Sequence, residues 1–568
     1  MEKSLLEMVR KVCFFVKIKC RKGGIMEKSL LEMVEETMPK LTTPLATVYE
    51  TFIFNNREHQ NKALVAITKA DKGQIILPTG TGKTRIQVAM IVRDMIAQTL
   101  AGTLGTYVIA SHRLLLNKQL MDELLDLCLK CGLPVNALYV GSARHDDKEV
   151  YDKYFQHNIG DFRVDYTTSS PEIRSFATET KTANRHLIVV STYHSFDSLS
   201  CLDNIDICAY DEAHNTTEEN FRDNILKVLP KIKRNYFFTA TRKVCVISGH
   251  GMEDEAIYGK VIAEVSPTEM INAGEILRPR IITMFLDNDT PKGSVSTSNQ
   301  HMLVKTITEA FARSKDRVKA DSSNPDAIGN KMIVSSEGSD ELNIVQESPE
   351  FKTWCQANHV RVFSFSSKYG SFIDFEKSDR DTVYDAMKGI SDQEDAILLH
   401  IDILTEGMDL PAITSILLLR NLNEISLFQT LGRGLRLTRN DRQGLYSGAI
   451  TKEQFVKRHA YLVLPLHFEK MDTSCEDMKR TIQDVVGTYG IPVEEFLPPE
   501  GFKAKKTDAL DLVTKTKMKL KAGKDFPLLS VIEDFIIGEV KKGLPKDPKG
   551  LYDALMGMFK RMGGKSNA

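Results

Sequence analysis

The stretch GQIILPTGTGKT at Gly73–Thr84 decides the fold of this 568-residue chain. An apolar run leads into a glycine-rich turn, and Lys83 and Thr84 open a helical pattern. Glycines let the backbone curl so that its N–H groups point at phosphate oxygens, beside a helix N-terminus that favours anions. In such loops the lysine contacts phosphate and the threonine hydroxyl contacts Mg²⁺. The strict pattern GxxxxGK[ST] is not met because Leu77 replaces its first glycine, but GTGKT still predicts binding of a nucleoside triphosphate.

Short apolar runs alternate with helical patterns around this loop, from about residue 45 to 465. The candidate strands of a first set are Gln74–Leu77, Thr106–Ala110, Leu187–Val190, Ile205–Tyr210 and Tyr236–Thr239. Those of a second set are Lys331–Ser335, Val360–Phe365, Ala396–His400 and Ser415–Leu419. Apolar runs of this length, separated by helices, indicate parallel strands buried on both faces. We therefore expect an α/β fold with two tandem parallel-sheet domains.

Shifts in composition suggest the domain boundaries. We expect an N-terminal extension at 1–44, α/β domains at 45–265 and 266–468, and a basic, mainly helical C-terminal domain at 469–568. Residues 266–300 should form the connector, and the polar stretch 142–186 a surface insertion or irregular helices. The nonapeptide MEKSLLEMV occurs at Met1–Val9 and again at Met26–Val34. We interpret it as a recent duplication, an expression scar or an alternative start at Met26, with a functional N-terminal arm as the alternative.

The composition excludes several classes of protein. Hydrophobic residues make up 42% and charged residues 27%, which is typical of globular proteins and not of disordered or fibrous ones. Lys+Arg at 75 and Asp+Glu at 76 nearly cancel, so any nucleic-acid surface must be local. Nine cysteines without regular spacing suggest a reduced compartment. No apolar run is long enough to cross a bilayer. We expect no membrane association and a cytoplasmic location, which would be the host cytoplasm for a viral or phage protein.

Two local features have weaker interpretations. Residues 501–568 hold 15 Lys and Arg against 8 Asp and Glu. This excess is typical of a solvated face, but contact with a nucleic-acid backbone and docking of a partner subunit are the alternatives. Cys128 and Cys131 have metal-like spacing without a second ligand pair, so we expect two buried thiols on a helix.

A carboxylate pair follows another apolar run, in IDICAYDEAH at Ile205–His214. Asp211 and Glu212 stand directly after the candidate strand. At the C-terminal edge of a parallel sheet, beside a phosphate loop, one carboxylate can bind Mg²⁺ and a second can orient and deprotonate the attacking water. An isolated Asp-Glu pair is usually surface decoration, but the strand and the upstream loop favour the chemical interpretation.

These residues resemble the motifs of superfamily 2 helicases and translocases of the DEAH-box kind, close to restriction-enzyme motor subunits and to viral or phage DNA helicases. The resemblance covers about residues 50–465 and implies two RecA-like domains that use ATP and Mg²⁺. The motifs of the first domain occur in the family's order: REHQ at Arg57–Gln60, SHRLLLNKQL at Ser111–Leu120, STYHS at Ser191–Ser195, DEAH at Asp211–His214 and TAT at Thr239–Thr241.

The second domain supplies IDILTEGMDLP at Ile401–Pro411 and QTLGRGLR at Gln429–Arg436, which contains every fixed position of the arginine motif QxxGRxxR. Charge builds on the transferring phosphoryl group, and a guanidinium from a neighbouring domain can stabilise it. Arg433 and Arg436 are three residues apart, so on a helix they should point to one side. Ile401 replaces the threonine of many relatives, so a hydroxyl contact is lost there.

The resemblance implies a role for each matching residue. The catalytic residues are Lys83, Asp211, Glu212, Gln429, Arg433 and Arg436. The residues that bind the metal ion are Thr84 and Asp211. The ATP-binding residues are Gln60, Thr79, Gly80, Thr81, Gly82, Lys83, Thr84, Gly407 and Asp409. The residues that contact nucleic acid are Arg113, Gln119, Thr192 and Asp402. The residues that couple hydrolysis to movement are His214, Thr239 and Thr241.

The function expected from this resemblance is that of an ATP-dependent helicase or translocase. DNA is the preferred track, because of the similarity to restriction-type and phage motors. An RNA helicase, translocation without strand separation, and a nucleotide-gated clamp with little hydrolysis are the alternatives. Contacts made mostly to phosphates carry little sequence information, so we expect sequence-independent binding that weakens steeply with salt.

Overall fold

The computed structural model describes most of the chain between residues 44 and 467 and four short pieces beyond it. The described residues are 44–54, 56–112, 114–141, 162–244, 250–286, 295–336, 338–366, 368–400, 412–420, 422, 424–467, 481, 484–485, 487–489 and 496–497. The expected N-terminal extension and most of the expected C-terminal domain lie outside them. The chain forms two compact units: the first runs to Val265 with the exception of Pro78–Thr81, and the second begins at Ser266.

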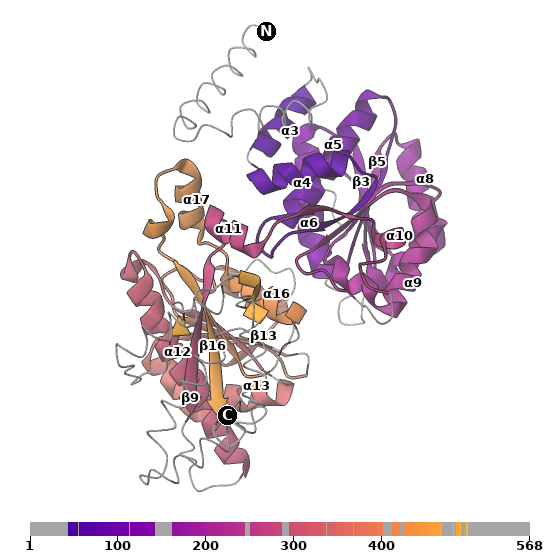
Figure 1. The fold of residues 1–568 in the computed structure, drawn as a ribbon. Coiled ribbons are helices and arrows are strands. Elements are labelled where there is room, and N and C mark those ends of the chain that lie inside the picture. The colour runs from indigo at the N-terminus through magenta and orange to yellow at the C-terminus, as the bar shows by residue number, and fades with distance from the viewer. Residues whose placement is uncertain are drawn as a thin grey trace, which may run out of the picture. The chain divides into compact units, whose positions relative to one another are not determined.

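The first unit contains an eight-stranded sheet in which every strand pair is parallel (Figure 1). In spatial order the strands are β4 (Val164–Thr167), β3 (Val135–Val140), β5 (His186–Thr192), β2 (Thr106–Ser111), β6 (Ile205–Tyr210), β7 (Ile232–Thr239), β1 (Lys72–Ile76) and β8 (Val261–Glu264). The sequence predicted five of them within a few residues. The strands β3, β4 and β8 were not predicted.

Helices cover both faces of this sheet because alternate strand residues point to opposite sides. One face packs against α3 (Pro44–Phe54), α4 (Glu58–Thr68), α5 (Lys83–Leu100) and α6 (Leu114–Cys131). The other packs against α8 (Ser170–Thr182), α9 (Glu219–Val228), α10 (Glu255–Tyr258) and the 3-10 helix η1 (Tyr193–Cys201). Two more 3-10 helices are η2 (Ala213–Thr217) and η3 (Leu229–Lys231). Consecutive residues of β2 therefore face opposite sides of the sheet. Tyr107 and Ile109 face the helices α3 to α6, whereas Val108 and Ala110 face α8, α9, α10 and η1.

Cys128 and Cys131 are buried on α6, which confirms that these thiols behave as small hydrophobes. Burial raises the pKa of both thiols, so they stay protonated.

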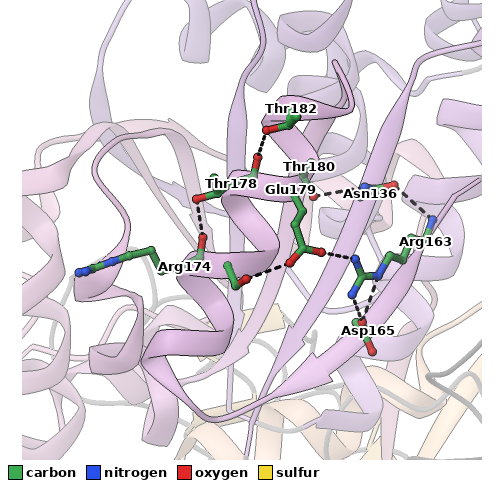
Figure 2. Close-up of polar contacts among 9 residues, drawn as sticks. Asn136, Arg163, Asp165, Arg174, Thr178, Glu179, Thr180 and Thr182 are labelled. Atoms are coloured by element: carbon green, nitrogen blue, oxygen red, sulfur yellow. Dashed lines mark hydrogen bonds and ion pairs between the residues drawn. The ribbon is translucent and has the colours of Figure 1, made fainter.

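The edge of this sheet corrects the interpretation of residues 142–186. We expected an insertion or irregular helices, but residues 164–182 supply the strand β4 and the regular helix α8. Figure 2 shows the polar contacts that join them: the Arg163 guanidinium donates to Asp165 at 2.8 Å and to Glu179 at 2.6 Å, while Arg174 extends away. The Asn136 amide, on β3, donates to Thr180 at 3.2 Å. A short polar-flanked strand is hard to recognise because only two of its four residues are buried.

The second unit has a nine-stranded sheet. In spatial order its strands are β13 (Glu376–Ser378), β12 (Gly370–Ile373), β11 (Arg361–Ser366), β14 (Ala396–His400), β10 (Lys331–Ser335), β15 (Ser415–Leu418), β16 (His459–His467), β9 (Arg278–Leu286) and β17 (Phe496–Leu497). Its helices are α11 (Pro267–Ala273), α12 (Val295–Asp321), α13 (Ser339–Gln346), α14 (Pro349–Ala357), α15 (Arg380–Lys388), α16 (Glu424–Gly434) and α17 (Arg439–Ser447), with the 3-10 helices η4 (Pro325–Ala327) and η5 (Lys452–Gln454).

Two features of the second unit differ from expectation. The stretch 266–300 is no simple connector, because it contains α11 and the strand β9, which pairs with β16 over nine residues. The sheet is also not wholly parallel: β12 and β13 form an antiparallel extension of β11. Asp374 and Phe375 form the two-residue turn of that hairpin, both with positive φ, and the Asp374 carboxylate accepts the Val362 N–H.

Within the described residues, no helix is long and apolar enough to cross a membrane.

Candidate active site

The carboxyl ends of the strands of the first sheet bring the predicted motifs together. All strands of that sheet are parallel, so the residues at the carboxyl ends of β1, β7, β6, β2 and β5, and directly after them, lie along one edge. These residues are the phosphate loop, Thr239–Thr241, Asp211–His214, Ser111–His112 and Thr192–Ser195. Ligands of open parallel sheets bind at this edge. Motifs that are far apart in the sequence therefore share one surface.

The phosphate loop requires glycine at two positions. Gly80 has a φ of 85° and Gly82 a φ of 84°, in the left-handed region that favours glycine. A Cβ atom on Gly82 would also lie 2.3 Å from the side-chain nitrogen of Gln60. Gly82 directly precedes α5, a helix of 18 residues. The loop thus has the backbone conformation that an anion site at a helix N-terminus needs.

Gln60 holds this loop from the start of α4. Its Oε1 accepts the backbone N–H of Arg57 at 2.9 Å, and its Nε2 donates to the Gly82 carbonyl at 3.4 Å. The side chain is buried. Arg85, in the first turn of α5, donates to the Asn56 side chain at 2.5 Å and stacks 3.9 Å over the Phe52 ring. Gln60 and Arg85 therefore hold the segment that contains Phe52, Asn56 and Gln60 against the phosphate loop and the start of α5.

Three charged side chains converge at the loop. Lys83 Nζ lies 3.5 Å from Glu212 Oε1, with side-chain exposures of 9% and 14%. Asp211, also buried, accepts a 2.8 Å hydrogen bond from Gln87 Nε2 on α5. Burial raises the pKa of Asp211, the neighbouring Glu212 carboxylate raises it further, and Lys83 opposes both. Two adjacent carboxylates with a single lysine have an affinity for an additional cation.

Glu212 has a strained backbone. Its φ of 47° and ψ of 51° are left-handed, which is uncommon for a residue with a side chain. Asn215 stabilises the turn, because its backbone N–H and its side-chain amide both donate to the Glu212 carbonyl at 3.1 Å. Strain of this kind persists where the surroundings enforce it and is common at functional sites.

His214 connects the carboxylate motif (DEAH, Asp211–His214) to the threonine motif (TAT, Thr239–Thr241) at the end of β7. His214 Nδ1 lies 2.9 Å from Thr239 Oγ1, and that hydroxyl donates to the Thr241 carbonyl at 2.9 Å. The hydroxyl proton is thus used, so Nδ1 is the donor to Thr239. Burial lowers the pKa of His214 to about 4, which keeps the ring neutral at pH 7. The three predicted coupling residues are therefore in direct contact.

The predicted nucleic-acid contacts are only partly described. Thr192 is the last residue of β5 and lies at the same edge as the phosphate loop. Gln119 lies in α6, but its side chain is outside the description. Arg113 and Asp402 lie outside the described residues, as do the predicted nucleotide-binding residues Gly407 and Asp409.

The arginine motif of the second unit corrects one expectation. Gln429 and Arg433 are buried on α16, but this helix ends at Gly434, so Arg436 lies beyond it and not on the same helical face. A Cβ on Gly434 would lie 3.2 Å from both Ala460 Cβ and Ile416 Cδ1. The Nε2 of Gln429 has no hydrogen-bond partner among the described residues.

A buried lysine holds the end of α16. Lys457 Nζ donates to the carbonyls of Gly434 at 2.6 Å and Arg436 at 2.8 Å, and the Leu277 N–H donates to the carbonyl between them, that of Leu435. The Asp441 carboxylate accepts the backbone N–H of Lys457 at 3.0 Å. Burial lowers the pKa of Lys457 well below its usual value. Three successive carbonyls around Arg436 are therefore held in place.

The residues present suit a magnesium–nucleotide complex. No three His, Cys, Asp or Glu side chains converge as a metal cage in the described part of the chain. Mg²⁺ usually needs only one or two protein ligands when substrate phosphates supply others. Asp211, which follows β6, and Thr84, at the second position of α5, would be the residues that supply oxygen ligands at the loop.

Sequence reasoning missed two residues that hold Asp211. Gln87 is four residues after Lys83 on α5, so helical spacing was a usable signal for its position beside the loop. Tyr193 lies within the STYHS motif, and its hydroxyl donates to the Asp211 carbonyl at 2.6 Å. The sequence carries no signal for this contact, because it joins the ends of strands that are not neighbours in the sheet.

Comparisons with known proteins concern the family and the fold of this chain. Residues 53–244 match the family model described as type III restriction enzyme, res subunit. No curated protein matches the chain. The type ISP restriction-modification enzyme LlaBIII, solved bound to DNA, superposes with a TM-score of 0.53 and 14% identity over 76% of this chain and 29% of its own.

Two further solved structures are similar. A nuclease-deletion mutant of the type ISP enzyme LlaGI, in complex with a DNA substrate mimic, has a TM-score of 0.51 and 15% identity over 88% of this chain and 36% of its own. Mss116p, bound to single-stranded RNA and AMP-PNP, has a TM-score of 0.50 and 12% identity over 94% of this chain and 85% of its own. The chain spans about a third of the length of the two type ISP enzymes.

These comparisons confirm the resemblance to superfamily 2 helicases and restriction-enzyme motors. They also confirm the predicted fold of two tandem RecA-like domains, which the two sheets display. At 12 to 15% identity the structural likeness concerns the fold alone.

Proposed function

We propose that this chain is an ATP-dependent nucleic-acid motor, a helicase or translocase of the superfamily 2 type. The observation that carries the proposal is the convergence of Lys83, Asp211 and Glu212 at a phosphate loop with two left-handed glycines. The match to a restriction-motor family over residues 53–244 supports it.

The proposed chemistry is hydrolysis of ATP. The loop N–H groups and Lys83 bind the β- and γ-phosphates, with Thr84 and Asp211 as the residues that would hold Mg²⁺. The metal ion, when bound, neutralises charge on the phosphate oxygens. Glu212 orients the attacking water and accepts its proton. Lys83 Nζ lies 3.5 Å from Oε1 of that carboxylate.

The second unit contributes the other catalytic residues in this proposal. Arg433 and Arg436 stabilise charge on the transferring phosphoryl group, and Gln429 assists them. Lys457 and Leu277 restrict the backbone around Arg436, which reduces the reorganisation needed during the reaction. His214, Thr239 and Thr241 link the state of the carboxylate motif to the strand β7.

The proposed track is DNA. The restriction-type family match supports DNA, as do the type ISP structures, which were solved with DNA or a DNA mimic. Thr192, together with Arg113, Gln119 and Asp402, is assigned to the strand. RNA remains the second candidate, because Mss116p of similar fold was solved with single-stranded RNA.

Steady-state ATP hydrolysis tests both parts of the proposal. The purified protein is assayed alone and with single-stranded DNA, duplex DNA, branched DNA or RNA, with Glu212→Gln as the control. Stimulation by one polymer, abolished in the variant, supports a motor and identifies its track. A near-zero rate with every polymer would overturn the motor and favour the clamp.

A further inference from the structure

Tyr193 connects two functional segments that the sequence separates by 18 residues. It is fully buried at the start of η1, directly after Thr192. Its hydroxyl donates a 2.6 Å hydrogen bond to the backbone carbonyl of Asp211. Burial raises the pKa of Tyr193 well above its usual value, so the hydroxyl keeps its proton.

The acceptor of this bond has a particular position in the site. The Asp211 carbonyl belongs to the peptide group that joins Asp211 to Glu212. Rotation of that peptide plane changes ψ of Asp211 and φ of Glu212 together, and φ of Glu212 is already strained at 47°. Such a rotation would turn both carboxylates relative to Lys83. The Tyr193 hydroxyl therefore holds the backbone element on which both carboxylates depend.

The backbone of Tyr193 belongs to the segment Thr192–Ser195, which we assign to the nucleic-acid strand. The Asn224 side-chain amide, on α9, donates to the carbonyls of Tyr193 and His194 at 3.2 Å each. Thr192 is half-buried and His194 is exposed, so both flank Tyr193 at the surface. A polymer that contacts this segment acts on the backbone next to the buried ring.

We propose that Tyr193 is a positioning residue that couples polymer binding at Thr192–Ser195 to the orientation of the Asp211–Glu212 peptide. The inference rests on the proposed function, because it needs a polymer that stimulates hydrolysis. It is distinct from the contact between His214 and Thr239, which joins the carboxylate motif to β7. Tyr193 joins the same motif to the segment after β5.

The test compares Tyr193→Phe with a matched variant. Tyr236 is also buried in the first sheet, and its hydroxyl donates to the carbonyls of Ala70 at 2.8 Å and Ile67 at 3.1 Å, before β1 and away from the phosphate loop. Tyr236→Phe therefore removes an equivalent buried hydroxyl from the opposite end of the strands. Hydrolysis is measured with and without saturating polymer, together with KM for ATP, polymer affinity and the thermal unfolding midpoint.

The expected result is a split between these quantities. In Tyr193→Phe the ratio of stimulated to unstimulated rate falls about tenfold, as expected for loss of a buried hydrogen bond. KM for ATP and polymer affinity change less than about twofold, and Tyr236→Phe keeps the wild-type ratio. An unchanged ratio in Tyr193→Phe, or an equal fall in both variants, overturns the inference. Absence of stimulation in the wild-type protein overturns the proposed motor as well, and is seen before any variant is compared.

A second variant keeps the test decisive if Tyr193→Phe does not fold. Asn224 is only half-buried, so Asn224→Ala releases the Thr192–Ser195 backbone without opening the core. The ratio must fall in this variant too. A wild-type ratio in Asn224→Ala, with Tyr193→Phe unfolded, overturns the inference.

Discussion

Lys83 Nζ and Glu212 Oε1 lie 3.5 Å apart, on side chains that are almost fully buried. The two residues come from different segments: Lys83 begins α5 and Glu212 follows β6. The lysine partly neutralises a carboxylate pair in a site that excludes most water, where charges interact strongly. This contact links the phosphate-binding group to the proposed base.

Replacing Lys83 should abolish hydrolysis. Lys83→Ala removes the proposed phosphate contact, and we expect kcat/KM for ATP to fall at least about a hundredfold. The measurement is steady-state hydrolysis with the stimulating polymer. Lys62→Ala is the matched control, because Lys62 forms an exposed pair with Glu58 on α4. Full hydrolysis by Lys83→Ala would refute the assigned site.

Replacing Gln87 should weaken the response to magnesium. Gln87 donates to the Asp211 carboxylate and lowers its pKa, so Gln87→Leu should favour the protonated carboxyl. We expect the Mg²⁺ concentration for half-maximal hydrolysis to rise about tenfold, with recovery at high Mg²⁺. Gln98→Leu is the control on the same helix, since Gln98 donates to Asp94 at 3.1 Å. An identical Mg²⁺ dependence in both variants would contradict this role.

Replacing Lys457 should affect both stability and catalysis. Lys457→Met leaves the buried carbonyls of Gly434 and Arg436 without their donor, and we expect a loss of roughly 3 kcal/mol in the free energy of unfolding. The maximal rate of hydrolysis should fall as well, because the backbone of Arg436 is released. Denaturant unfolding and kcat are measured. The control Lys452→Met removes an exposed lysine that donates to the Asn272 carbonyl, and it should change little.

The stability of the first unit should fall at acid pH through His186. The Gly105 N–H donates to His186 Nδ1 at 2.9 Å, so this nitrogen must be unprotonated, and Nε2 donates to Thr99 Oγ1 at 2.8 Å. Burial lowers the pKa of His186. As the pH falls below about 6.5, His186 is protonated in the unfolded chain before it is protonated in the folded chain. The free energy of unfolding therefore decreases as the pH falls below that value.

The measurement is the thermal unfolding midpoint between pH 7.5 and 5.5. In His186→Asn, which cannot titrate, the fall in the midpoint should be smaller by about 2 °C or more. His301→Asn is the control, because His301 lies in an exposed pair with Glu350. A slope in His186→Asn equal to that of the wild-type protein would rule out this origin.

The central strands could be predicted from the sequence because their pattern is local. The runs Ile205–Tyr210, Lys331–Ser335 and Ala396–His400 coincide with β6, β10 and β14. Each is mostly apolar and is buried along its whole length, as expected for a strand covered on both faces. Edge strands have a weaker signal: β4 and β13 are short and partly exposed, so they resemble loops. The strand β9 was missed because it lies in a stretch whose composition suggested a connector.

The sequence by itself determined the type of site, because GTGKT, DEAH and QxxGRxxR are local patterns whose chemistry depends on residue type and spacing. Only the tertiary structure decided which groups hold these motifs in place. The Tyr193–Asp211 hydrogen bond, the Gln87–Asp211 hydrogen bond and the Lys457 contacts around Arg436 join residues from 18 to 124 positions apart. Such partners are set by strand order and by the need of buried polar groups for a hydrogen bond, neither of which a local pattern contains.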